Sequence, residues 1–285
     1  MTTETQVIAA QAAQAGRRGR GRGKLGRFAI RLPALVLAIL LWQVVATVFD
    51  TPFFPPFLDI LARFRADWLS GPPSQLFLSD AFITNALPTI TRLAAGWLIG
   101  VLVGVLIGSL IARLPRVGAA LEPLVRFGMS LPAPALLPLA IAFFGLDAGG
   151  KIFFIALGAV WPVIVGTAAG LRGADPVAIA SARSLTLPAA TLFLKVRIPL
   201  ASPQIMSGLR VSVNAAVLLI IVAELYATTT GIGFMIVNSQ RNFDILGTWS
   251  GIFLLALLGI VCNGLFVLVE RRVMRWQIIP REAQK

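Results

Sequence analysis

The chain has 285 residues, of which 57% are hydrophobic and only 13% are charged, whereas soluble proteins carry roughly 25% charged residues. The mean hydropathy is +0.86, so composition excludes an ordinary soluble domain and predicts an all-α membrane protein. The sequence has no histidine and one cysteine, Cys262, which excludes histidine-based catalysis, histidine metal sites and internal disulfides. We therefore expect no catalytic residue and no metal site. The net charge of +13 fits basic cytoplasmic loops of a membrane protein better than nucleic-acid binding.

Long uncharged segments predict about six transmembrane helices. Five gaps between charged residues contain 18 to 25 uncharged residues, and about 20 apolar residues cross the hydrocarbon core of a bilayer. A sixth gap, between Arg210 and Glu224, is shorter. We expect its helix to begin near Gln204, with Arg210 reaching back to the interface. The predicted spans are 31–50, 87–112, 120–144, 151–171, 204–224 and 247–269.

The distribution of basic residues predicts that both termini face the cytoplasm. With that orientation, 20 of the 25 Lys and Arg residues lie in cytoplasmic segments or at their flanks, as the positive-inside rule requires. Residues 1–30 are then a disordered basic cytoplasmic N-terminus that can also touch anionic membrane lipids, and 277–285 are a cytoplasmic tail. Residues 51–86 form an extracytoplasmic loop, in which 60–69 is amphipathic.

Four glycines in the second predicted span are spaced four apart and share one face of a helix. They are Gly96, Gly100, Gly104 and Gly108. Small residues in such a row let two helix backbones approach closely in a membrane. This face therefore predicts helix packing, either against another helix of the same chain or against a second copy.

The third predicted span contains three prolines, Pro132, Pro134 and Pro138. Each proline lacks a backbone N–H group and disturbs a helix. In a membrane, the freed carbonyl groups need burial in protein or contact with a cavity. Both a broken helix beside a pathway and an ordinary kinked helix fit this pattern.

The segment 172–203 is long for a connection between two spans and predicts short helices of its own. Asp175 followed by Pro176 is typical of a helix N-terminus, because Asp caps the helix and Pro suits its first position. Apolar residues then recur at helical spacing after Pro188. Connections of this length are commonly functional, so we expect a docking surface for a cytoplasmic partner.

The same segment resembles the inner-loop motif of binding-protein-dependent ABC transporter permeases, which reads Glu-Ala-Ala, three residues, Gly, about nine residues and aliphatic-x-Pro. Residues 179–186 and 192–199 occupy its two parts with the spacing preserved. Ala180 stands where the motif has Glu, and Thr186 where it has Gly. The likeness extends over 85–276. Further matches resemble the subfamily that imports nitrate, sulfonates and taurine: 131–138, 143–146, 170–173, 222–224, 231–233 and 270–276.

The resemblance implies a type I ABC importer permease fold over residues 85–276, with 172–203 as the cytoplasmic coupling loop. It further implies a permease homodimer in the cell inner membrane, two copies of an ABC ATP-binding subunit that use ATP and Mg, and an extracytoplasmic substrate-binding protein. The chain itself would bind no cofactor and would not be an enzyme. The sequence agrees independently, because it lacks a Gly-x-x-x-x-Gly-Lys-Ser/Thr phosphate loop. The implied substrate is a nitrate-, sulfonate- or taurine-like anion, and the alternative is an aromatic carboxylate or a pyrimidine-type vitamin precursor.

The resemblance also implies which residues touch the ATPase: Ser181, Ala182, Arg183, Ser184, Leu185, Thr186 and Pro199. For the pathway or gate, Glu224 is the most notable acid, because ionisable residues in membrane spans are functional candidates. A solvated charge at a helix end is the alternative. The other pathway candidates are Asn214, Thr228 and Thr229. Arg92, at the outer end of the second span, could attract an anion or reach to the interface.

A secondary transporter or channel and a membrane enzyme are the rival interpretations. Secondary transporters often contain inverted repeats and acids near the membrane centre, whereas this sequence has no clear repeat and almost no acids within its spans. A membrane enzyme would need catalytic side chains, and the chain has few candidates. The sequence therefore favours the permease.

Overall fold

The computed structural model describes residues 24–145, 147–226 and 229–275. The predictions for residues 1–23, for Thr228 and for the tail 277–285 lie outside these ranges. Every regular element in the described residues is helical. The chain divides into two compact units, residues 1–62 and 63–285, with the boundary inside helix α3 (Phe57–Trp68).

The first unit consists of helix α2 (Lys24–Phe49), a turn and the start of α3. The turn is fixed to the end of α2, because the indole of Trp42 stacks on Phe54 at 4.7 Å and donates to the Pro55 carbonyl at 3.2 Å. Residues 24–30 are helical, whereas the sequence predicted disorder up to residue 30. Helix α2 therefore begins upstream of the predicted first span and contains Pro33 in its interior.

Four helices among the described residues are long and apolar enough to cross a membrane: Phe82–Arg113, Ala148–Arg172, Ala189–Tyr226 and Ile245–Val273. A fifth candidate is the pair Pro115–Ser130 and Ala133–Phe144, which is bent by 98°. The shorter apolar helix Pro33–Phe49 corresponds to the first predicted span. Each of the six predicted segments thus contains helix, but length and composition alone support four to five spans.

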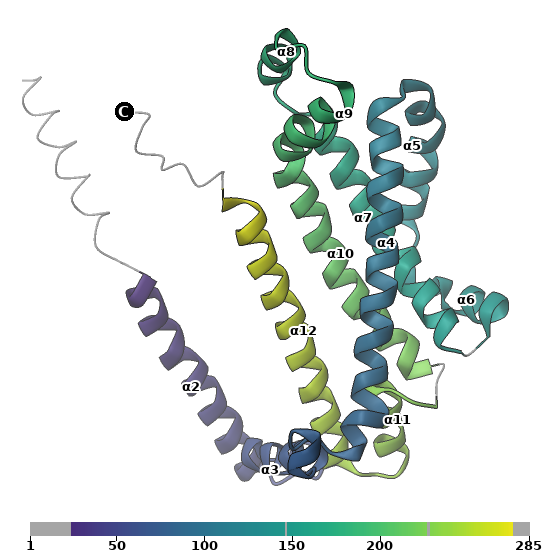
Figure 1. Cartoon of the computed structure of the whole chain (residues 1–285). Coiled ribbons are helices and arrows are strands. Elements are labelled where there is room, and N and C mark those ends of the chain that lie inside the picture. The colour runs from purple at the N-terminus through teal and green to yellow at the C-terminus, as the bar shows by residue number, and fades with distance from the viewer. Residues whose placement is uncertain (1–23, 146, 227–228, 276–285) are drawn as a thin grey trace, which may run out of the picture. The chain divides into compact units, whose positions relative to one another are not determined.

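Helix α7 (Ala148–Arg172) packs on both α4 (Leu87–Arg113) and α10 (Ile198–Tyr226), and these three helices form the centre of the second unit (Figure 1). The row of four glycines lies buried on α4 and faces α7. A Cβ atom added at Gly100 would lie 3.1 Å from the Cβ of Ala159, and one added at Gly104 would lie 2.7 Å from the Cβ of Val163. The glycine face thus contacts a helix of the same chain.

The third predicted span is broken rather than kinked. Helix α5 (Pro115–Ser130) ends before Leu131, and a short 3-10 turn (Ala133–Leu136) leads into α6 (Leu137–Phe144). Leu131 and Pro132 are extended, with ψ of 129° and 103°. A residue before proline is pushed out of the helical region, so the dipeptide Leu131–Pro132 ends α5 and permits the sharp bend.

Two spans begin earlier than predicted, and both contain a π-turn that ends two positions before a proline. The π-turn Phe82–Ala86 precedes α4 and Pro88, and the π-turn Phe193–Arg197 precedes α10 and Pro199. The wider turn relieves the clash between the proline ring and the preceding carbonyl, so the helix continues across it. Within the predicted loop 172–203, Pro176–Ser184 is helical, and a second helix starts at Ala189 and continues into the fifth predicted span.

The second unit is closed by α11 (Ile232–Arg241), α12 (Ile245–Val273) and the end of α3. Asp244 caps α12 by accepting from the Gly247 N–H at 2.9 Å and also pairs with Arg63 at 2.7 Å. The fully buried Trp68 donates to the Ser250 hydroxyl at 2.9 Å. The predicted amphipathic helix over 60–69 is thus confirmed, and it packs on α12.

Candidate coupling surface and buried polar cluster

Helix α8 (Pro176–Ser184) follows α7 after three residues and projects from one end of the second unit (Figure 1). Its start is built as predicted, because the Asp175 carboxylate accepts the Val177 N–H at 2.9 Å and Pro176 is the first helical residue. None of its residues is buried. Val177 and Leu185 are 69% and 70% exposed. Exposed apolar side chains on a projecting helix are typical of an interaction site.

The residues predicted to contact an ATPase lie in two separate elements of the structure. Five of them lie exposed on α8 and the turn after it, and Ala182 is half-buried there: Ser181, Ala182, Arg183, Ser184, Leu185 and Thr186. Pro199 instead belongs to the first turn of α10 and is half-buried. The structure therefore brings the first six together and places Pro199 in the helix that follows.

Thr186 has a φ of +51°, in the left-handed region. This region favours glycine, and a β-branched residue is rarely found there. The Thr186 N–H donates to the Arg183 carbonyl at 3.0 Å and so closes the turn after α8. The backbone thus keeps a glycine-type conformation at the position where the permease motif has Gly.

The opposite end of α10 carries a cluster of buried polar residues, here called the Glu224 cluster. Its members come from the π-turn before α4, the start of α4, the end of α10 and the loop before α11: Asn85, Thr89, Arg92, Glu224 and Thr230. The Glu224 side chain is 0% exposed. Both of its oxygens lie 2.8 Å from the Thr89 hydroxyl, and it accepts from Arg92 and from the Gly233 N–H at 3.2 Å each.

The same cluster holds the loop before α11. Arg92 donates to the Thr230 carbonyl at 3.0 Å and to its hydroxyl at 2.8 Å, while the Thr89 hydroxyl accepts the Ile232 N–H at 3.0 Å. Gly231 has a φ of +132°, and a Cβ atom there would overlap the Glu224 carboxylate. Only glycine fits this position, so the loop, the carboxylate and α4 form one bonded unit.

Lys151, on the first turn of α7, adds a third charge nearby. It is 5% exposed and interacts electrostatically with Arg92, Glu224 and Asp147. Buried charges are tolerated when they are paired and hydrogen-bonded, which is how Glu224 is held. The described part of the chain contains no group of three or more Asp, Glu, Cys or His side chains placed to hold a metal.

The predicted pathway residues differ in burial. Glu224 is buried and bonded, rather than solvated at a helix end, and Arg92 is engaged with it rather than reaching to the interface. Thr229 is exposed on the loop after α10, and Asn214 is exposed on α10 itself. The sequence interpretation missed Thr89 as a partner of Glu224, because the two residues lie 135 positions apart.

The sequence profile of the family described as "binding-protein-dependent transport system inner membrane component" matches residues 100–275. SsuC of Bacillus subtilis (strain 168), whose name assigns it to aliphatic sulfonate transport as a permease, is 33% identical over 273 residues, covering 93% of each chain. The nitrate import permease protein NrtB of Leptolyngbya laminosa is 31% identical over 189 residues, covering 65% of this chain and 67% of that protein.

Among solved structures, a chain of the MetNI methionine ABC transporter in inward-facing conformations matches with a TM-score of 0.59. The match covers 69% of this chain and 99% of the other at 15% identity, which shows a shared type I ABC importer permease fold. The family match and the SsuC likeness together cover nearly the whole sequence. The chain therefore belongs to the family of binding-protein-dependent transport system inner membrane components, and it is a multi-pass membrane permease of the ABC transporter class.

Proposed function

We propose that this permease imports a small anion of the sulfonate, taurine or nitrate kind, driven by a separate ATPase that docks on α8. The observation that carries the proposal is the capped and projecting helix α8, on which Val177 is 69% exposed and directly after which Leu185 is 70% exposed. The substrate class is supported by relatives named for sulfonate and nitrate transport. Two ATP-binding subunits, which use ATP and Mg, serve a homodimer of this chain.

In this proposal the α8 end faces the cytoplasm, and so do both termini. The basic residues support this orientation, because Arg183, Lys195 and Arg197 lie on α8 or in the π-turn before α10, and cytoplasmic segments are enriched in Lys and Arg. The α11 end then faces outward and receives the substrate-binding protein. Thr229 is exposed at that end and belongs to the receiving surface.

Glu224 acts in this scheme as a positioning residue for the outer gate. Its carboxylate bonds the loop before α11 to α4 through Thr89 and the Gly233 N–H. Asn214, exposed on α10 about 15 Å further along the helix, lines the pathway. A polar side chain on a membrane-spanning helix faces protein or a water-filled space more readily than lipid.

The docking surface is tested with Arg183→Glu, because reversing a charge at an interface repels a complementary partner. We expect uptake of the substrate to fall at least about tenfold, the order of 1.4 kcal/mol in coupling, while the variant reaches the membrane normally. Arg116→Glu is the matched control, since Arg116 is also exposed near the start of α5 but lies outside α8. Unchanged uptake by Arg183→Glu would remove α8 as the docking surface.

The partner and the substrate are tested separately. Tagged chain purified from mild detergent is expected to bring an ATP-binding subunit in near-equal amount. Repeated recovery of the chain alone would favour a secondary transporter or channel. The associated binding protein is then screened for thermal stabilisation by taurine, alkyl sulfonates and nitrate. Stabilisation only by an aromatic carboxylate or a pyrimidine would move the substrate to the alternative class.

A further inference from the structure

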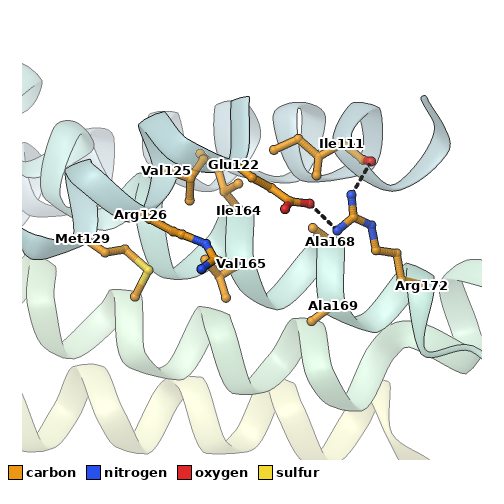
Figure 2. Close-up of a pocket in the computed structure, with 10 residues that line it drawn as sticks. All are labelled: Ile111, Glu122, Val125, Arg126, Met129, Ile164, Val165, Ala168, Ala169 and Arg172. Carbon is orange, nitrogen blue, oxygen red and sulfur yellow. Dashed lines mark hydrogen bonds and ion pairs between the residues drawn. The ribbon is translucent and has the colours of Figure 1, made fainter. Parts of the chain in front are cut away.

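A half-open pocket of about 310 Å³ lies between α4, α5 and α7, toward the α8 end (Figure 2). Its floor is apolar and includes Val125, Ile164 and Ala168. Its charged lining residues are Glu122 and Arg126 from α5 and Arg172 from the end of α7. We call it the α5–α7 pocket. Nothing in the coupling surface or in the Glu224 cluster uses it.

Arg172 and Glu122 neutralise one another at one end of this pocket. One guanidinium nitrogen of Arg172 lies 2.5 Å from the Glu122 carboxylate, and another donates to the Ile111 carbonyl at 3.0 Å (Figure 2). The pair joins the end of α7 to α4 and α5. It fixes the wall of the pocket but leaves one positive charge unbalanced among its lining side chains.

That remaining charge is Arg126, one helical turn beyond Glu122. Arg126 is exposed, and none of the ion pairs found in the described ranges involves it. Arg126 and Val165 both line the pocket, and Figure 2 draws them with the rest of its lining. An arginine on an apolar membrane-spanning surface is costly unless an anion or water meets it. The position thus provides a cation that lacks an ion-pair partner among the residues that the structure describes.

We propose that the α5–α7 pocket binds an anionic phospholipid from the leaflet at the α8 end. The phosphate binds Arg126, with Arg172 alongside, and an acyl chain lies along the apolar floor, whose α7 residues extend about 8 Å from Ile164 to Ala169. The apolar majority of the lining favours a lipid over a small free anion, which would need several donors. Basic pockets between membrane helices are suited to such headgroups. Only the assignment to the cytoplasmic leaflet rests on the proposed orientation.

The test uses the complete transporter in mild detergent and native mass spectrometry. Dioleoylphosphatidylglycerol is compared with dioleoylphosphatidylcholine as the added lipid. We expect the wild-type complex to retain phosphatidylglycerol, and Arg126→Gln to weaken that retention about fivefold, since one basic residue contributes about 1 kcal/mol toward an anionic lipid. Arg116→Gln removes an exposed arginine of the same helix outside the pocket and should retain the lipid as the wild type does.

A second variant, Ala169→Phe, fills the pocket without changing its charge. Ala169 is an exposed lining residue on α7, so we expect this variant to fold and to lose phosphatidylglycerol to a similar extent. Equal retention by the wild type and Arg126→Gln would overturn the proposal. Retention of phosphatidylglycerol by Ala169→Phe would also overturn it. Displacement of the lipid by excess sodium nitrate or sulfate would overturn it as well, and would assign Arg126 to a free anion. None of these results depends on whether α8 binds the ATPase.

Discussion

The two ends of the long helix Ala189–Tyr226 differ in how their polar residues are used. At the α11 end, Glu224 is fully buried, and its oxygens are bonded by Thr89, Arg92 and a backbone N–H group. At the α8 end, no residue of α8 is buried, and Thr186 holds an unfavourable backbone conformation. Residues that stabilise the fold are thus paired within the chain, whereas those suited to a partner are left exposed.

The largest loss of stability is expected for Glu224→Ala, at the end of the helix where the polar residues are buried and paired. Removing one member of a buried charge pair leaves the other uncompensated and typically costs about 3–5 kcal/mol. We expect a clear fall in the thermal unfolding midpoint of the detergent-purified transporter. Glu122→Ala removes the acid of an exposed pair, in which Glu122 is 39% exposed, and should cost at most about 1 kcal/mol.

A double variant distinguishes the loss of the ion pair from the loss of side-chain packing in the Glu224 cluster. Replacing both members of a buried pair is less damaging than replacing one, because no charge is left alone. Arg92→Leu combined with Glu224→Leu should therefore unfold at a higher temperature than Glu224→Leu alone. Strictly additive losses would show that the ion pair does not couple the two residues.

The next largest effect is expected at the α4–α7 contact. A leucine at Gly100 has no space, because its Cβ alone would lie 3.0 Å from the Ala156 carbonyl oxygen. Overpacking of this kind costs about 1–3 kcal/mol, so Gly100→Leu should lower the yield of assembled transporter in size-exclusion chromatography. Val103→Leu, at a 41% exposed position of the same helix, is the control, and equal yields from both variants would contradict the contact.

The smallest effect is expected for Thr186→Gly, which should stabilise the turn after α8 rather than destabilise it. A left-handed conformation costs a non-glycine residue about 1–2 kcal/mol, and glycine's greater chain entropy offsets part of the gain. Thr186→Gly should therefore slow hydrogen exchange in the turn after α8. Thr191→Gly, inside helix α9 (Ala189–Leu192), should accelerate it. Faster exchange in both variants would show that Thr186 is not strained.

The helical segments could be predicted from the sequence because a bilayer demands long uncharged stretches, and such stretches are visible without tertiary contacts. The break at Leu131–Pro132 was one of two predicted alternatives for the same local reason. The helix starts were less predictable. The starts near residues 87 and 204 were predicted from uncharged stretches, whereas a π-turn before Pro88 and another before Pro199 let each helix begin earlier. Nothing in the local sequence predicted these π-turns.

The candidate site was predictable only where its residues are close in sequence. The turn after α8 was expected from the resemblance of residues 179–186 to the permease motif, and the positive φ at Thr186 agrees with the glycine that this motif has there. Glu224 was identified as notable, but its environment depends on Thr89 and Arg92, which lie 135 and 132 positions away. Pairings over such distances arise from helix packing, which one sequence does not reveal.

The continuous helix Ala189–Tyr226 has a mechanical consequence. Its 38 residues correspond to a rod of about 57 Å, longer than the roughly 40–45 Å of a whole bilayer. One end adjoins the turn that carries Thr186, and the other ends two residues after Glu224. Tilting such a rod by one degree about one end displaces the other by about 1 Å. A small rotation at the α8 end is therefore enough to strain hydrogen bonds on the far side of the membrane.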